Sequence, residues 1–190
     1  MEASETPVNK PKKEKKKKQS RSVETMFRTT MSNHIQLSGM ADQKAGLMVS
    51  TNSIIISITI TFLVQHFGAN PKLLLPTTLL VVVCLLTITF ALLSTRPNVK
   101  SKSERLSIEK SKIDLLFFGD YLALSREEYT SEMKQLLSND NQLHNAMIEN
   151  IYAQGSVVER KYKLLKIAYS IFIIGFPMVL CYYLIVLYWG

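Results

Sequence analysis

Cysteine is scarce in this sequence, which has only Cys84 and Cys181 among its 190 residues. Both lie inside long apolar runs, where a thiol behaves as a small apolar side chain. Domains held together by disulfides are small, secreted and rich in cysteine. The sequence therefore excludes a disulfide framework, and no internal repeat is evident.

Residues typical of an active site are also lacking. The sequence has no Gly-rich phosphate-binding loop, no clustered metal ligands and no nucleophile beside a general base. Its three histidines, His34, His66 and His144, fall in three different parts of the chain. We therefore expect no enzymatic activity, no metal and no cofactor.

Charged residues are absent from three long apolar runs within 46–67, 73–94 and 167–189. Each run is close to the ~20 residues that an α-helix needs to cross the ~30 Å hydrocarbon core of a bilayer. A chain of 190 residues cannot wrap three fully apolar helices in a soluble core. The sequence predicts an all-α membrane protein with transmembrane helices at 46–67, 73–94 and 166–189.

Positive charge is concentrated on one side of these runs. Residues 1–45 hold 10 basic and 5 acidic side chains, and residues 96–166 hold 12 basic and 10 acidic ones. The connector between the first two runs contributes only Lys72. Because basic flanks remain on the cytoplasmic side, we expect a multi-pass inner-membrane protein. Its N-terminus and residues 95–165 would be cytoplasmic, and its C-terminus would lie outside.

Residues 1–22 form a lysine-rich block with two prolines and little to bury, so they are predicted to be a disordered tail. The first apolar run begins only at residue 46, so we expect no signal peptide. The cluster Lys15, Lys16, Lys17 and Lys18 suits anionic membrane lipid, and equally a polyanion such as a nucleic acid. Both interpretations stay open.

Helical signals continue outside the apolar runs. Residues 23–45 are predicted to form a cytosolic N-terminal helix, and residues 95–165 a cytosolic helical region. Within that region Ser125 and Glu128 form a capping box that starts a helix. From residue 142 onward the helical spacing continues into the third span, which gives a stalk and span roughly 70 Å long at 1.5 Å per residue. Gly155 is the expected place for a bend.

Small and polar side chains form one strip along the first span. They recur every three or four residues and so share one face of a helix. The strip comprises Asp42, Gly46, Ser50, Ser53, Ser57, Thr61 and Gln65. Such a strip either lets helices pack closely or lines an aqueous pore, where hydroxyl groups hydrate ions. One protomer has too few helices to enclose a pore, so the second explanation requires a homo-oligomer.

Asp42 and Lys44 stand at the cytosolic end of this span. Two residues apart on a helix, they point away from each other and cannot pair. Lys44 can extend its ammonium group to lipid phosphates, whereas Asp42 needs another partner. Asp42 is therefore the candidate gate residue at the mouth of the pore.

Three motifs carry a family resemblance. They are LSGMADQKAGLMVSTNSIII at 37–56, LLFFGDYLALSREEYTSEM at 115–133 and IYAQGSVVERKYKLLKIAYSIF at 151–172. In this order they resemble the motifs of the Pycsar-effector transmembrane family, over about residues 30–190. The residues that carry the resemblance are Ser38, Met40, Ala41, Asp42, Lys44, Ala45, Asn52, Leu115, Leu116, Phe117, Phe118, Gly119, Lys161, Tyr162, Leu164 and Leu165.

The resemblance implies a membrane effector of bacterial antiphage defence, which disrupts the inner membrane to halt phage production. A companion nucleotidyl cyclase or nucleotidyltransferase would make its regulatory ligand, a nucleotide messenger or nucleic-acid oligomer that either opens the assembly or holds it shut. Phe117, Phe118 and Tyr121 are candidates to stack on a base, or else pack the cytosolic segment against the stalk. Gly119 is expected to bend the chain. An alternative function is a non-conducting membrane scaffold that recruits a soluble partner through residues 96–166.

Overall fold

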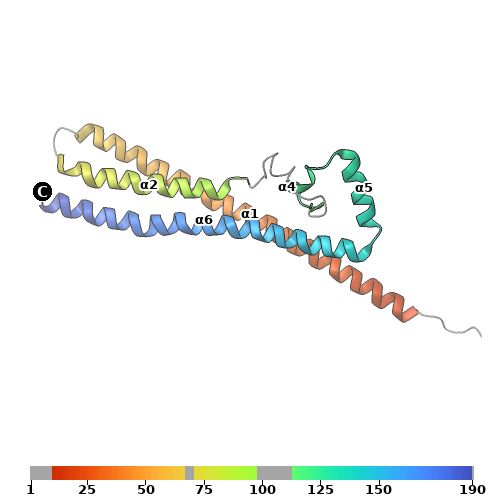
Figure 1. The fold of residues 1–190 in the computed structure, drawn as a ribbon. Helices are drawn as coiled ribbons and strands as arrows, with labels where there is room; N and C mark the ends of the chain where they lie inside the picture. Colours follow the sequence, from red (N-terminus) through yellow and green to blue (C-terminus); the bar gives the residue numbers. More distant parts are fainter. Residues whose placement is uncertain (1–9, 67–70, 98–112, 190) are drawn as a thin grey trace, which may run out of the picture.

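The computed structural model describes residues 10–66, 71–97 and 113–189, and the side chains of 21–64, 72–97 and 113–189. Every regular element in this part of the chain is a helix. In chain order they are α1 (Lys10–His66), the short 3-10 helix η1 (Pro71–Leu73), α2 (Leu74–Thr95), α4 (Phe118–Tyr121), α5 (Arg126–Leu137) and α6 (Asp140–Trp189). Figure 1 shows α1, α2 and α6 side by side at one end and α4 and α5 toward the other. The predicted all-helical fold is confirmed.

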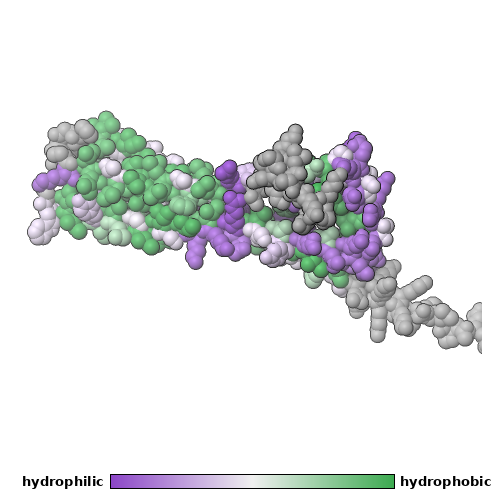
Figure 2. Space-filling model, viewed as in Figure 1, coloured by the Kyte–Doolittle hydropathy of each residue, from purple (hydrophilic) through white to green (hydrophobic). Residues whose placement is uncertain are grey.

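Three helices are long and apolar enough to cross a membrane, namely α2 and the apolar parts of α1 and α6. Most residues in these apolar segments are exposed on the surface of the bundle. Figure 2 shows hydrophobic residues covering the three-helix end as far as a band of hydrophilic ones. Exposing such a surface to water costs roughly 25 cal/mol per Å² of apolar area, whereas lipid tails are as apolar as the side chains. The chain is therefore a membrane protein with three candidate spans.

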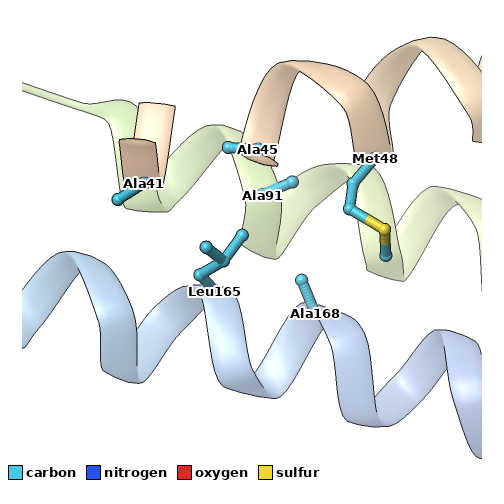
Figure 3. Packing of buried hydrophobic residues seen from close by; sticks show 6 residues of the cluster. All are labelled: Ala41, Ala45, Met48, Ala91, Leu165 and Ala168. Atoms are coloured by element: carbon cyan, nitrogen blue, oxygen red, sulfur yellow. The ribbon is translucent and has the colours of Figure 1, made fainter. Parts of the chain in front are cut away.

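Small side chains form the core where the three helices meet near the end of α2. Figure 3 shows side chains from α1, α2 and α6 that gather in this core. The cluster comprises Ala41, Ala45, Met48, Ala91, Leu165 and Ala168. Alanine predominates because small side chains let helix backbones approach closely, which drives association when lipid surrounds the helices.

Gly175 lets α6 approach α2 closely beside a second cluster, formed by Leu80, Cys84 and Val179. A Cβ atom at position 175 would lie 2.9 Å from Cγ1 of Val83. Valine is β-branched and stiff about χ1, so its side chain cannot easily turn away. The missing side chain of Gly175 therefore sets the spacing of these two helices.

The two longest helices extend far beyond their apolar segments. α1 begins at Lys10, whereas the sequence predicts a disordered tail over 1–22 and a helix only from residue 23. Lysine, glutamate and glutamine dominate this segment and have high helix propensity, which is consistent with the earlier start. α6 is one helix of 50 residues. It continues through Gly155, where a bend was predicted, and a Cβ atom there would lie 3.4 Å from Cε1 of His34.

The predicted capping box starts α5. Ser125 Oγ accepts a hydrogen bond from the Glu128 backbone N–H at 3.2 Å, and Glu128 Oε2 accepts one from the Ser125 N–H at 3.0 Å. After α5 the chain turns, and Asn139 Oδ1 accepts hydrogen bonds from the backbone N–H groups of Asn141 and Gln142. These side-chain caps satisfy N–H groups that have no partner within the first turn of a helix.

Candidate functional site

Lys161 of α6 is joined to α1 by an ion pair. Its Nζ donates hydrogen bonds to Asp42 Oδ1 and Oδ2, at 2.8 and 2.7 Å, and to Ser38 Oγ at 2.9 Å. The Lys161 side chain is only 16% exposed, whereas that of Asp42 is 44% exposed. An ammonium group has three N–H donors. Ser38 and Asp42 therefore occupy the full donor capacity of Lys161.

The next residue of α6 makes a second contact with α1. The Tyr162 hydroxyl donates a hydrogen bond to the Leu37 carbonyl oxygen at 3.3 Å. Lys44 Nζ lies 5.9 Å from the centre of the Tyr162 ring, within the range of a cation–π interaction. Both contacts join residues of the first and third motifs, so these motifs meet in one cluster where α1 and α6 cross.

The partner of Asp42 was missed by the reasoning from local spacing. Asp42 and Lys161 are 119 residues apart in the sequence, and helical periodicity relates only residues a few positions apart. One signal was available. Lys161 lies near the start of the third span and Asp42 near the start of the first. If the segments before both spans are cytoplasmic, the two residues lie at the same end of the bundle.

The predicted pore-lining strip lies mainly on the outer face of α1. The exposed members are Gly46, Ser50, Ser53, Ser57 and Thr61. The hydroxyls of Ser57 and Thr61 each donate a 2.9 Å hydrogen bond to the carbonyl oxygen four residues earlier. The strip thus turns away from α2 and α6, except for Asp42, which reaches α6. The side chain of Gln65 lies outside the described residues.

A different face of α1 packs against the rest of the bundle. It carries Ala41, Ala45, Met48 and Asn52, which recur at helical spacing and are all buried. Asn52 is fully buried, and its Nδ2 donates a 2.8 Å hydrogen bond to the Met48 carbonyl oxygen. Close packing within one chain therefore uses this alanine-rich face. The hydroxyl strip remains available to lipid, to water or to a second copy of the chain.

The aromatic motif forms the short helix α4 and the residue before it. The ring of Phe117 lies over Gly119, where a Cβ atom would be 2.7 Å from Phe117 Cε1. Gly119 lies within α4, so it admits this ring rather than bending the chain as predicted. Phe118 is 58% exposed. The centroids of the Phe118 and Tyr121 rings are 6.3 Å apart in a T-shaped arrangement, and those of Tyr121 and Tyr129 are 5.0 Å apart.

A side-chain network ties this segment to α6. Asp114 Oδ2 accepts a hydrogen bond from Asn150 Nδ2 at 3.1 Å, and Asp114 Oδ1 accepts one from the Leu116 backbone N–H at 2.8 Å. Asn150 is buried. The segment that precedes α4 is thereby held against α6.

A cleft of about 420 Å³ connects the ion pair with the aromatic motif. It opens between α1, the end of α2, α4 and α6, whose arrangement is shown in Figure 1. Among its lining residues are Ser38, Asp42, Arg96, Phe117, Phe118, Gly119, Arg160 and Lys161. Residues of all three motifs thus border one cavity, which carries basic side chains and aromatic rings together.

The other predicted residues lie elsewhere. Met40 is exposed on α1, and Tyr121 stands behind Phe118. The side chains of Lys15, Lys16, Lys17 and Lys18 lie outside the described residues, so their binding of lipid or nucleic acid stays a prediction. Within the described residues no three His, Cys, Asp or Glu side chains gather as metal ligands would.

The fold and the charged cluster define an all-helical membrane protein with three candidate spans and a polar region at one end. The chain matches the family model described as the Pycsar effector protein domain over residues 25–188. It therefore belongs to the Pycsar effector transmembrane family, which confirms the resemblance. Members are cyclic-nucleotide-triggered antiphage membrane effectors, generally not enzymes, and they act with a cyclic-nucleotide-producing cyclase. No curated protein and no solved structure shows a significant match to the chain.

Proposed function

We propose that this chain permeabilises the inner membrane as a homo-oligomeric pore, under the control of a nucleotide ligand made by its partner enzyme. The observation that supports a pore is the outward position of the hydroxyl strip on α1. A single chain has three candidate spans, too few to enclose an aqueous path. Several copies could do so by directing these strips toward a common axis.

The hydrogen bonds of the strip are compatible with both a resting and an open state. Because the hydroxyl hydrogens of Ser57 and Thr61 are donated to their own backbone, these groups tolerate a lipid environment. Their oxygen lone pairs remain able to contact water or a cation. The strip therefore suits a surface that lipid covers before assembly and water wets after it.

Asp42 is placed at one end of this strip, where its carboxylate is half-exposed and held by Lys161. The basic flanks favour a cytoplasmic position for this end of the bundle, on the side where a messenger would be made. We assign Asp42 the role of a gate residue at the cytoplasmic mouth. Its carboxylate would attract cations in the open state, as acidic rings do in cation channels.

Flux through liposomes tests this proposal. Purified protein is reconstituted with an entrapped dye and challenged with cyclic nucleotides, and Ser57→Leu and Thr61→Leu are compared with the wild type. Both substitutions are on exposed positions and should reduce flux severalfold without loss of insertion. Ile58→Leu, at a 65% exposed position outside the strip, is the matched control and should conduct normally.

Equal flux from the two strip variants and the wild type would contradict a conducting strip. If the wild type releases no dye with any nucleotide while it retains a soluble partner on residues 96–166, the chain is a scaffold. Crosslinking in the membrane provides a separate measure of self-association. A protein that never crosslinks beyond a monomer would exclude the pore.

A further inference from the structure

The cleft beside the Lys161–Asp42 pair has the chemistry of a nucleotide site. We propose that it binds the cyclic nucleotide, and that the ligand phosphate replaces the Asp42 carboxylate on Lys161. This inference rests on the proposed control by a nucleotide ligand and gives that control a location. It also gives it a direction, because binding at Lys161 weakens the contact between α1 and α6.

The charge of the lining favours a small anion. Among the described residues that line the cleft, Arg96, Arg160 and Lys161 contribute three positive charges and Asp42 one negative charge. The net charge of +2 exceeds the single negative charge of a cyclic phosphodiester. The cleft volume of about 420 Å³ lies in the range of roughly 300–1,000 Å³ that is typical of small-molecule sites.

The ring of Phe118 is the candidate surface for the base. It is 58% exposed although it lines the cleft, and its ring makes a T-shaped contact with that of Tyr121. More than half of the residue is therefore accessible to a base. Phe117 is less suitable, because its ring is occupied by the contact with Gly119.

The hydrogen bonds of Lys161 couple ligand binding to the contact between α1 and α6. All three N–H donors of Lys161 are taken by Ser38 and Asp42, so a phosphate can reach this ammonium group only by displacing one of them. Asp42 is 44% exposed and can be rehydrated, whereas Lys161 is 16% exposed and needs an anion beside it. The ligand and Asp42 therefore compete for one cation.

This competition makes an uncommon prediction for Asp42→Asn. Removing the negative charge of this lining residue should tighten nucleotide binding, since the competing carboxylate and its repulsion of the phosphate are both lost. We expect about tenfold tighter binding, which is the effect of about 1.4 kcal/mol. Phe118→Ala should instead weaken binding about 5- to 140-fold, the range given by one base–aromatic stack.

The test is titration of the full chain in detergent micelles by calorimetry with the four 3′,5′-cyclic ribonucleoside monophosphates. Asp42→Asn and Phe118→Ala are compared with Glu159→Gln, which removes an acidic group from the same helix turn as Lys161. Glu159 pairs with Lys163 and does not line the cleft, so its variant should bind as the wild type does. Phe118→Leu keeps the apolar bulk without the ring and should also bind weakly.

Several outcomes would overturn the inference. If a nucleotide binds the wild type and all four variants equally, the site lies elsewhere, while the proposed function stands on the flux assay. If Asp42→Asn weakens binding, the competition is wrong. If Phe118→Ala and Phe118→Leu bind as tightly as the wild type, Phe118 does not contact the base. Absence of binding by the wild type refutes the cleft as a nucleotide site, whereas nucleotide-triggered dye release decides the proposed function independently.

Discussion

Disrupting the Lys161–Asp42 pair should weaken the contact between α1 and α6 and lower the free energy of unfolding by a measurable amount. Hydrogen bonds to charged groups contribute about 1.5–3 kcal/mol, and fully exposed ion pairs about 0.2–1 kcal/mol. Lys161 is mostly buried but Asp42 is 44% exposed, so the pair lies between these cases. We expect a coupling energy of about 1–2 kcal/mol.

A double-mutant cycle measures this coupling. Asp42→Asn, Lys161→Met and the double variant are unfolded reversibly in mixed micelles, and the free energies of unfolding are compared. Asp42→Asn should be the more harmful single change, because it leaves a buried ammonium group without its carboxylate. Lys161→Met leaves a carboxylate that water already reaches.

The same helix offers a matched control. Glu159 and Lys163 form an ion pair at 2.6 Å, with side chains 63% and 71% exposed. Exposed pairs at this spacing contribute about 0.3–0.5 kcal/mol. A coupling energy for Asp42 and Lys161 no larger than that of the control pair would refute the claim that partial burial strengthens the contact.

Two further predictions concern helix packing and helix capping. Gly175→Ala should destabilise the bundle by about 1–3 kcal/mol, because the new Cβ would lie 2.9 Å from Cγ1 of Val83. This loss should disappear in a Val83→Ala background. Additive effects of the two substitutions on the free energy of unfolding would show that these helices are not in close contact. Ser125→Ala should cost about 1 kcal/mol of α5 stability, because the capping box with Glu128 is lost. Amide exchange in the first turn of α5 should become faster in this variant, but not in Ser131→Ala, which lies in the middle of α5. Equal exchange in both variants would contradict the cap.

Features that depend on local sequence were predictable. The three apolar segments follow from the absence of charge, and the start of α5 follows from Ser125 and Glu128, because both signals act within a few residues. The long α6 follows from unbroken helical spacing. The family, too, was identified from motifs that are short and continuous.

Features that depend on contacts between distant segments were not predictable from spacing. The hydroxyl strip was identified, but only the fold shows that α1 packs through Ala41 and Ala45 instead. Gly119 was expected to bend the chain, whereas it accommodates the ring of Phe117. The cleft unites residues from three motifs, and its existence depends on how α1, α2, α4 and α6 are placed.

The unbroken length of α6 has a mechanical consequence. Its only proline is Pro177, so from Asp140 to that point the helix is a stiff rod of about 55 Å at 1.5 Å per residue. A tilt of about 5° over this length displaces one end by about 5 Å relative to the other. Lys161 lies between the two ends, so a tilt of α6 that follows release of Asp42 would move the segment before Lys161 and the apolar segment after it in opposite directions.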